Sequence, residues 1–224
     1  MTASEDLQIL VRKAARALGR HGLVHAYGHC SARIDADSFL VCAPKPMGMI
    51  QPGEAGSVVP VDGPLPDGVL GEVRIHQQIY KRRPDVGGIV RSMPPKAMSL
   101  GTLRLTPKAR NGFGSYFAPE VPLWDDPLLL RTDEQAVALG LQMGEAKAIL
   151  MRGNGAVVAA DDLVQAVVLT WYLEDACRVE MDALSLAGHG DPAIFTEDQV
   201  KVRATGAGRI FERMWDYLTD SDPE

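Results

Sequence analysis

Residues 71–97 read GEVRIHQQIYKRRPDVGGIVRSMPPKA, a stretch that combines a helical pattern, a strand pattern and the start of a second helix. Apolar residues at helical spacing predict a helix over residues 72–82, and Pro84 ends it. The run DVGGIVRSM over residues 85–93 is typical of a strand. Pro94 and its neighbour suit the first turn of another helix, because a fixed φ and a missing N–H do least harm there. The stretch therefore predicts helices alternating with strands.

Toward the N-terminus, the sequence predicts a helix followed by a β-hairpin. Apolar residues recur every three or four positions in the first segment, so the helix has one apolar stripe and ends near Gly22. Thr2 or Ser4 is the candidate cap of this helix. HCSARI and SFLVCA flank the turn-forming residues 35–38, which is the pattern of a hairpin. Residues 44–71 are rich in Pro and Gly and predict a loop around the short strand VVPV.

Toward the C-terminus, helices and strands continue to alternate. The sequence predicts an aromatic loop over residues 111–127, a helix over 132–143, the strands AILMR and AVVAA, a long helix over 161–186, and a short helix from Thr196 to about Leu218. Together these elements predict the fold class α/β. We expect three layers, α/β/α, with a central, mainly antiparallel or mixed sheet that helices cover.

The composition is that of a globular domain without a strongly charged surface. The 224 residues are 46% hydrophobic and 23% charged, and they predict a single domain over residues 1–224, with residues 187–224 as a C-terminal helical extension. Lys and Arg number 23 against 29 acidic residues, a net charge of −6, so we expect no nucleic-acid partner. No segment has the pattern of a signal peptide or a membrane span, and the three cysteines are widely spaced. We therefore expect a cytoplasmic protein with no membrane partner.

Several blocks follow one another over residues 7–186: GHCSARI, a Pro-rich loop, GEVRIHQQIYKRRPDVGGIVRSMPPKA, ILMRGNGAVV and DDLVQAVVLTWYLEDACR. Their order resembles the class II aldolase and adducin family, whose blocks read approximately Gly-Asn-x-Ser-x-Arg, Ser-Glu followed by His, Val-His-x-His-Pro, and Asn-His-Gly. The resemblance implies that family's fold. It also implies a homo-oligomer, with a tetramer favoured, in which His189 could reach the site of a neighbouring subunit.

The resemblance implies a divalent metal held by three histidines, and at those positions this sequence has Arg91, Met93 and Asn154. Arg stays protonated, Met suits soft copper, and Asn alone cannot hold zinc. We therefore expect no metal and no other cofactor. A replacement metal site is an open alternative, although the spacing of its candidate ligands matches no known set. These candidates are His25, His29, Cys30 and His76.

The phosphate-binding positions that the resemblance implies are also altered. An Asn and small hydroxyl residues are expected there, and this sequence has His29, Leu70 and Gly71. Gly71 keeps a backbone donor but Leu70 adds no hydroxyl, so the anion-binding group of a sugar-phosphate enzyme is incomplete. We therefore do not expect a sugar phosphate as the substrate.

A different set of polar groups remains at these positions. Glu72 matches the catalytic glutamate that the resemblance implies, and His29 and Arg91 can replace the charge of a metal. We expect a metal-independent lyase, of the decarboxylase, aldolase or elimination type, that acts on a small carboxylated substrate, with an aromatic ring as one option. Arg91 would stabilise the developing oxyanion, while Glu72 or His29 would move the proton. The substrate-binding candidates are Ser31, Gly71, His76, Tyr116, Arg152 and Asn154.

Each of these residues also has a purely structural interpretation. Glu72 could be an acidic residue in the first turn of a helix, or the partner of Arg91 in an ion pair. His29 could be a strand residue whose ring forms a hydrogen bond with the backbone. Gly-Asn-Gly at residues 153–155 suits a plain tight turn. Arg152 could form only a salt bridge, and Tyr116 could close a core.

Two other functions therefore stay open. The main alternative is a non-catalytic aldolase- or adducin-like domain for binding or assembly, because such a domain would also lose its metal-binding histidines. A metal-dependent aldolase or decarboxylase with atypical ligands is a further alternative. The charged replacements at Arg91 and His29, together with the retained Glu72, favour an enzyme.

Overall fold

A seven-stranded mixed sheet forms the centre of the computed structural model, which describes residues 3–186, 188, 190 and 192–224. The strand order is β3-β2-β1-β4-β7-β6-β5, and every neighbouring pair is antiparallel except the parallel pair of β5 and β6. His189 lies outside the described residues. The strands are β1 (His29–Arg33), β2 (Ser38–Val41), β3 (Ser57–Pro60), β4 (Gly88–Ser92), β5 (Leu123–Trp124), β6 (Ala148–Met151) and β7 (Gly155–Ala160).

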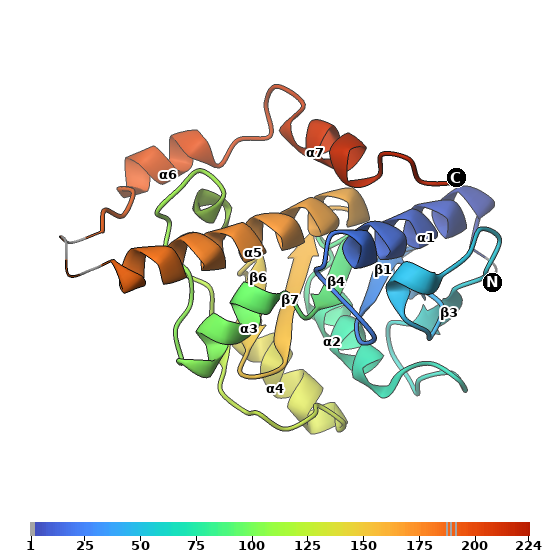
Figure 1. The fold of residues 1–224 in the computed structure, drawn as a ribbon. Coiled ribbons are helices and arrows are strands. Elements are labelled where there is room, and N and C mark those ends of the chain that lie inside the picture. The colour runs from blue at the N-terminus through green and yellow to red at the C-terminus, as the bar shows by residue number, and fades with distance from the viewer. Residues whose placement is uncertain (1–2, 187, 189, 191) are drawn as a thin grey trace.

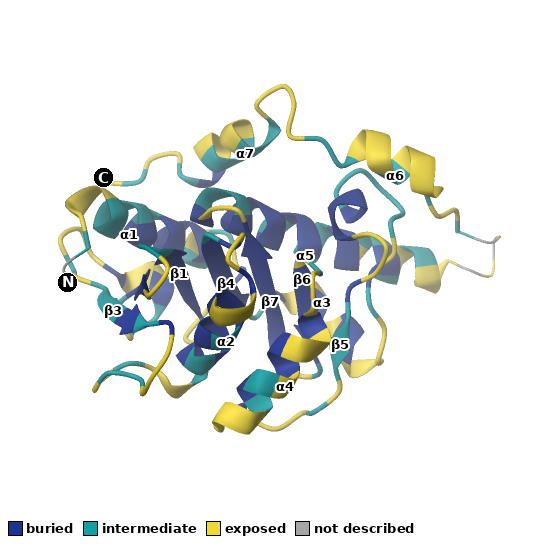
Figure 2. Ribbon diagram, turned by 180° about the vertical axis from the view of Figure 1, so that it is seen from behind, coloured by how far each residue is buried: buried dark blue, intermediate teal, exposed yellow. Residues whose placement is uncertain are grey.

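Helices cover both faces of this sheet, which confirms the predicted three-layer α/β/α fold (Figure 1). One apolar core lies between the sheet and α1, α3 and α5, and a second lies between the opposite face and α2 and α4. The five inner strands β2, β1, β4, β7 and β6 are almost entirely buried, while the edge strands β3 and β5 are mostly of intermediate burial (Figure 2). The helices are α1 (Glu5–Arg20), α2 (Arg74–Arg82), α3 (Pro95–Thr102), α4 (Asp133–Met143), α5 (Leu163–Ser185), α6 (Glu197–Arg203) and α7 (Ile210–Leu218), and the 3₁₀ turns are η1 (Met47–Met49), η2 (Gly71–Val73) and η3 (Gly114–Phe117).

The helix starts follow the capping residues in the sequence. Ser4, one of the two predicted caps, accepts a hydrogen bond from the backbone N–H of Leu7 at the start of α1. Thr132 and Gln135 form a capping box at the start of α4. Asp162 caps α5. These local side-chain contacts explain why the predicted helix starts agree with the structure to within one or two residues.

The predicted helix from Thr196 to Leu218 is wrong, because the structure has two short helices there. Thr196 caps α6, but the chain leaves the helix after Arg203. Two glycines follow, and Gly208 and Arg209 both adopt positive φ, at 72° and 56°. The turn they make redirects the chain, so that α6 contacts η3 while α7 contacts α5 (Figure 1).

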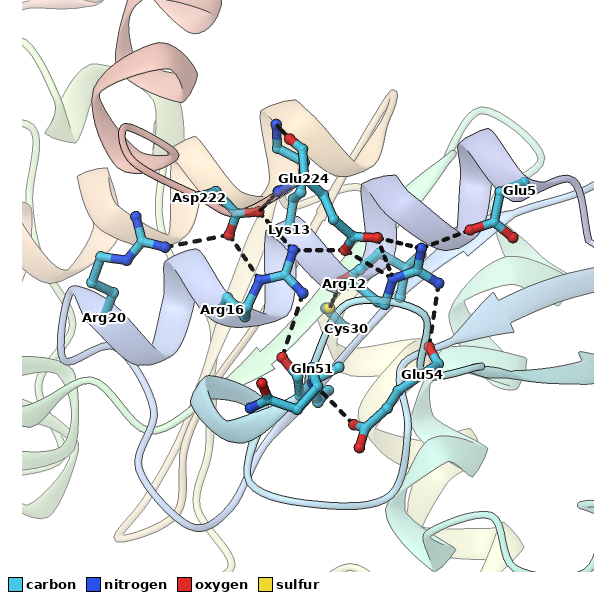
Figure 3. A network of polar contacts seen from close by, with 12 residues as sticks. Glu5, Arg12, Lys13, Arg16, Arg20, Cys30, Gln51, Glu54, Asp222 and Glu224 are labelled. Carbon is cyan, nitrogen blue, oxygen red and sulfur yellow. Dashed lines mark hydrogen bonds and ion pairs between the residues drawn. The ribbon is translucent and has the colours of Figure 1, made fainter.

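The chain after α7 returns across α1, and we call residues 219–224 the C-terminal strap. Three arginines on one side of α1 hold it through ion pairs to Asp222 and Glu224 (Figure 3). Nη2 of Arg16 lies 2.6 Å from a carboxylate oxygen of Asp222 and 2.8 Å from one of Glu224. The strap therefore fastens the C-terminal helices to the first helix. The other two arginines are Arg12 and Arg20.

In the part of the chain that the structure describes, every helix is too short or too polar to cross a lipid bilayer.

Candidate functional site

A buried arginine in the middle strand of the sheet is the centre of the candidate site. Arg91 lies on β4 with only 2% of its side chain exposed, on the same face as Ile89, toward α2. Its Nε atom is 3.0 Å from Oε2 of Glu72. Glu72 belongs to the turn η2 that leads into α2, and 20% of its side chain is exposed. The predicted ion pair between these residues is therefore present, and Glu72 links it to solvent.

The guanidinium of Arg91 is not fully hydrogen bonded. Its Nη2 atom donates to Oδ1 of Asn154 over 2.8 Å, but Nε and Nη1 have no hydrogen-bond partner in the part of the chain that the structure describes. The contact from Nε to Glu72 is close enough for an ion pair, but the N–H is not aligned with the carboxylate. Nδ2 of Asn154 and Nε2 of His29 are also buried and unpartnered. His29 pairs with Arg91 across β1 and β4.

These unpartnered groups gather in one place. Among the described residues, five buried side-chain nitrogen or oxygen atoms have no partner, and four of them belong to His29, Arg91 and Asn154. The fifth is Oγ of Ser92, whose place next to Arg91 in the strand directs it to the opposite face of the sheet. Buried polar groups are normally satisfied, so this cluster suits an external acceptor such as a carboxylate.

Burial also makes the charge of Arg91 costly. It lowers the pKa of the guanidinium, and the nearby carboxylate of Glu72 opposes that effect. A buried arginine with one partly exposed counter-ion is expected to destabilise the fold relative to an apolar side chain. The arrangement is therefore better suited to binding an anion than to stabilising the protein.

A chain of hydrogen bonds leads from His29 into the core. Nδ1 of His29 is 2.8 Å from Nε2 of His76, and Nδ1 of His76 is 2.6 Å from Oγ of Ser31. The hydroxyl of Tyr80 lies 3.0 Å from that oxygen. Burial lowers the pKa of His76 to about 3, and burial together with His76 and Arg91 lowers the pKa of His29 well below its usual value. Both imidazoles are therefore neutral near pH 7.

Two glycines position the side chains of this cluster. Gly155, at φ 88°, follows Asn154, and a Cβ atom there would lie 2.0 Å from the carbonyl oxygen of Ser92. Gly28, at φ 137°, precedes His29, and its Cβ would lie 3.0 Å from the carbonyl oxygen of Arg91. Only glycine allows both the backbone conformation and the close approach of the neighbouring strand.

The structure brings most of the predicted site residues together. Glu72, Arg91, Asn154 and His29 form the cluster. The remaining candidates near it are Ser31 and His76, through their hydrogen bonds, and Gly71, which adjoins Glu72 in η2. The tight turn predicted at residues 153–155 is also present, because β6 and β7 form a hairpin there. The turn and the side-chain role of Asn154 therefore coexist.

Two predicted site residues lie elsewhere in this chain. Arg152 points to the surface and pairs with Asp125. Tyr116 belongs to the core on the opposite face of the sheet, where its hydroxyl donates to the carbonyl of Thr205 over 2.7 Å. It packs against Tyr172 at a ring distance of 5.4 Å. The structural interpretations of both residues, a salt bridge and a core contact, are what this chain shows.

Sequence reasoning missed Tyr80. Its hydroxyl ends the chain of hydrogen bonds at Ser31, and it is buried beside Phe39. The sequence contained a signal, because Tyr80 lies four residues after His76 and thus on the same face of the predicted helix. The contact with Ser31 required the position of β1 beside α2, which helical spacing alone does not provide.

The cluster does not suit a divalent metal. Within the described residues, no three side chains of His, Cys, Asp or Glu are grouped so that they could hold a metal ion. The guanidinium of Arg91 would repel a cation at this position. The alternative ligand set is also dispersed, because Cys30 contacts the carbonyl of Val11 on the other face of the sheet and His25 is exposed in its loop.

A cavity of about 330 Å³ lies away from this cluster, between α5, η3 and the C-terminal helices. Its lining includes Phe113, Tyr116 and Tyr172, and its arginines, Arg203 and Arg213, are exposed. It has no carboxylate or imidazole in its lining that could move a proton. The cluster at Arg91 is therefore the better candidate for a catalytic site.

Comparison with known proteins gives a consistent picture. A family model described as the class II aldolase and adducin N-terminal domain matches residues 10–181. The 3,4-dihydroxyphthalate decarboxylase of Arthrobacter keyseri is 28% identical over 197 residues, covering 78% of this chain and 77% of that protein. Human beta-adducin is 24% identical over 128 residues, covering 56% of this chain and 17% of that protein.

The fold is also found among solved structures. The L-fuculose 1-phosphate aldolase from Glaciozyma antarctica PI12 superposes with a TM-score of 0.79, covering 98% of this chain and 91% of the other. At 18% identity, this likeness concerns the fold alone.

Proposed function

Because this chain belongs to the class II aldolase and adducin family, we propose that it is a metal-independent lyase of the decarboxylase type, acting on a small aromatic carboxylate. The observation that carries this proposal is the buried guanidinium of Arg91, two of whose nitrogens have no hydrogen-bond partner among the described residues, at a position where the family resemblance implies a metal. The relative named 3,4-dihydroxyphthalate decarboxylase supports the reaction and the substrate class. A phthalate carries two adjacent carboxylates on an aromatic ring, so one can be held while the other leaves.

Arg91 and Asn154 are the proposed anion-binding groups. Nη1 of Arg91 and Nδ2 of Asn154 are neighbouring donors, since Nη2 of the same guanidinium already bonds Asn154. A carboxylate oxygen that accepts from them would supply the missing partners and offset the cost of the buried charge. A neutral group could offer an acceptor but would not offset the charge.

The proposed step exchanges carbon dioxide for a proton. The bond between the ring carbon and the leaving carboxylate breaks, carbon dioxide departs, and the electron pair stays on the ring carbon. That carbon then forms a bond to the proton that Glu72 delivers. Arg91 holds the retained carboxylate in place, and its positive charge stabilises electrostatically the negative charge that builds up on the neighbouring ring carbon.

Glu72 is the proposed proton donor because it connects the buried cluster to solvent. Its side chain is partly exposed and its carboxylate lies beside Arg91. It can therefore take up a proton from water after each turnover and pass it inward. His29 is only 2% exposed, so Glu72, with 20% of its side chain exposed, has the more direct route to water.

The alternative function is a non-catalytic binding or assembly domain, and the similarity to beta-adducin is the observation that favours it. Such a domain would have no need of an unsatisfied buried charge at Arg91. A metal-dependent enzyme with atypical ligands is the further alternative. We also propose that the protein is a cytoplasmic homo-oligomer, with a tetramer favoured by the family resemblance, and that residues 1–224 form one domain with a C-terminal extension from residue 187.

The test is turnover of 3,4-dihydroxyphthalate in the presence of a chelator. We expect the wild-type protein to release carbon dioxide under these conditions. Glu72→Gln should lower the rate by at least about 100-fold, because positioned proton transfer contributes about that much or more. The matched control is Glu197→Gln, an exposed glutamate in the first turn of α6, which should leave the rate unchanged.

Other results would contradict the proposal. Turnover that is lost with the chelator and restored by zinc, manganese or iron would support the metal-dependent alternative. A folded protein that turns over neither 3,4-dihydroxyphthalate nor related aromatic carboxylates would support the binding domain. Full activity of Glu72→Gln would remove Glu72 from the mechanism.

A further inference from the structure

The hydrogen-bonded chain behind His29 has two possible proton arrangements. Its members are Tyr80, Ser31, His76 and His29, linked by contacts of 3.0, 2.6 and 2.8 Å. Both imidazoles are neutral, so each carries one N–H, and each contact needs one donor and one acceptor. The position of the proton on one side chain therefore determines the position of the proton on the next, along the whole hydrogen-bonded chain.

In the first arrangement, every donor points toward the site. Tyr80 donates to Oγ of Ser31, the Ser31 hydroxyl donates to Nδ1 of His76, and Nε2–H of His76 donates to Nδ1 of His29. The remaining N–H is then on Nε2 of His29, the atom without a partner beside Arg91. We call this the outward order.

In the second arrangement, every donor points into the core. Nδ1–H of His29 donates to His76, Nδ1–H of His76 donates to Oγ of Ser31, and the Ser31 hydroxyl donates to Tyr80. Tyr80 then donates to the backbone carbonyl of Ser31, 3.1 Å away. This inward order leaves a bare nitrogen at Nε2 of His29.

The two orders differ in what they present to a ligand. The outward order gives an N–H beside the free donors of Arg91 and Asn154, so all three side chains face an anion with donors. The inward order places a lone pair there, which would repel a carboxylate oxygen. A bound carboxylate therefore favours the outward order over the inward one.

We propose that Ser31 and His76 position His29 with its Nε2–H directed at the bound carboxylate, which makes His29 a specificity-determining residue for anionic substrates. This inference rests on the proposed function, because it takes an aromatic carboxylate as the ligand at Arg91. It assigns His29 to binding and leaves proton transfer to Glu72. Ser31 and His76 are positioning residues that touch no substrate themselves, whereas the hydroxyl of Tyr80 is the acceptor that the Ser31 hydroxyl uses in the inward order.

A role of His29 as a charged proton carrier is disfavoured by its surroundings. An imidazolium at His29 would lie buried beside the guanidinium of Arg91 on the neighbouring strand. Burial, His76 and Arg91 all lower the pKa of His29, so the neutral form persists. A neutral imidazole whose Nδ1 is already engaged can still donate from Nε2.

The binding test compares two substitutions at His29, with phthalate as the probe and titration calorimetry as the measurement. His29→Gln keeps an N–H close to the position of Nε2, whereas His29→Leu has a similar size and no donor. We expect His29→Leu to weaken phthalate binding by about 10- to 100-fold, as for loss of a hydrogen bond to a charged group, and His29→Gln to recover most of it. Thermal unfolding of each variant without ligand verifies that the fold is intact.

Nuclear magnetic resonance of ¹⁵N-labelled histidines tests the arrangement itself, because protonated and bare ring nitrogens have different shifts. With phthalate bound, we expect the proton of His29 on Nε2 and that of His76 also on Nε2. Tyr80→Phe removes the acceptor that the Ser31 hydroxyl uses in the inward order. This variant should therefore show the outward order even without phthalate, and it should bind phthalate at least as well as the wild type.

The outcomes separate this inference from the proposed function. One outcome would overturn the inference alone: Arg91→Met abolishes phthalate binding, and His29→Gln and His29→Leu weaken it equally. So would a bare Nε2 of His29 in the phthalate complex. Phthalate binding that Arg91→Met leaves intact would overturn the proposed function, and the inference would fall with it.

Discussion

Arg91 carries a charge into the interior of a sheet where most neighbours are apolar. Its pairing with Glu72 and Asn154 leaves two nitrogens, Nε and Nη1, without a hydrogen-bond partner among the described residues, and an unmet buried donor costs about 1–3 kcal/mol. A methionine of similar volume would avoid that cost. The residue is therefore better explained by a ligand than by the stability of the free protein.

The neutral histidines predict how stability depends on pH. His76 has a pKa of about 3 in the folded protein and about 6.5 when unfolded, so below pH 6.5 the unfolded chain binds a proton that the folded chain does not. Stability is thus fully present above pH 6.5 and is lost as the pH falls toward 3. From this residue we expect a loss of roughly 2 kcal/mol between pH 6.5 and pH 5, because each pH unit corresponds to about 1.4 kcal/mol.

Urea unfolding at pH 7.5 and pH 5 measures this difference. His76→Gln should be less stable than the wild type at pH 7.5, since it breaks the hydrogen bonds to His29 and Ser31, but it should lose less stability on acidification. An equal loss in both proteins would show that His76 is not held neutral.

At the scale of single residues, the sequence predicted the charged pair and part of its surroundings. A lone arginine in an apolar strand needs an anion, and Glu72 in the adjoining helix start was the nearest candidate. The partner of His29 was not predicted, because a backbone hydrogen bond was the simple expectation and the structure has the ring of His76 instead. That contact depends on how α2 lies against β1, which no local pattern encodes.

At the scale of elements, the hairpin of β6 and β7 delivers Asn154 to Arg91. The turn contains Gly153 at φ 67° and Gly155 at φ 88°, on either side of Asn154. The two glycines differ in their surroundings, because a Cβ at Gly153 would meet nothing within 4 Å while one at Gly155 would contact the backbone of β4. Alanine substitutions at the two glycines therefore separate the energetic cost of backbone strain from that of steric contact.

Gly155→Ala should destabilise the protein by more than 3 kcal/mol, since the new Cβ would lie 2.0 Å from the carbonyl oxygen of Ser92 and force β4 and β7 apart. Gly153→Ala should cost about 1–2 kcal/mol, the strain of a positive φ alone. Chemical denaturation of both variants measures the difference. Equal effects would mean that the close approach at Gly155 does not limit the hairpin.

Helices and strands were predicted correctly where the local sequence signal was strong. Capping residues and apolar periodicity located the helices, and Pro84 and the paired prolines after β4 marked their limits. The two-residue strand β5 was missed, because it is too short for a pattern and is defined only by its pairing with β6. The single helix predicted over 196–218 is wrong, because the segment that contains the glycines at 206 and 208 is not helical and separates α6 from α7.

At the scale of the whole molecule, the C-terminal strap joins the last residues to the first helix. The side chain of Asp222 is 1% exposed and pairs with Arg16, whose side chain is itself mostly buried. Burial raises the pKa of Asp222, but the hydrogen bond from Arg16 and further contacts outweigh it and the net pKa is lowered. The hydrogen bond from Arg12 is the largest cause that lowers the pKa of Glu224 to about 2. Both carboxylates therefore stabilise the fold at neutral pH. Glu224 loses that effect as the pH falls from about 4.5 toward 2, and Asp222 loses it as the pH falls below its usual pKa of 3.8.

Asp222→Asn should lower the free energy of unfolding at pH 7 by about 3 kcal/mol, because it leaves Arg16 with only part of its counter-charge. Asp220→Asn is the matched control, since that side chain is exposed and its one hydrogen bond among the described residues is accepted from the hydroxyl of Ser221. Urea unfolding at pH 7 measures both. Similar stability of the two variants would mean that the strap contributes little to the fold.

The overall architecture was predictable because the order of the sequence blocks resembles one family, and the family model covers residues 10–181. The composition of the site was less predictable. Tyr116 and Arg152 had suitable chemistry, yet Tyr116 lies in η3 on the opposite face of the sheet and Arg152 pairs with Asp125 at the surface. Sequence blocks thus indicated which positions meet, while the surrounding packing decided which side chains face one another.

The metal content of active protein, purified without a histidine tag and measured by mass spectrometry per chain, tests most directly whether Arg91 takes the place of a metal. We expect well below one metal ion per chain, unchanged after incubation with zinc, manganese or iron, in a preparation that turns over an aromatic carboxylate. The proposed role of Arg91 would be contradicted if the protein contains close to one metal ion per chain, if a chelator removes both the metal and the activity, and if adding the metal back restores the activity.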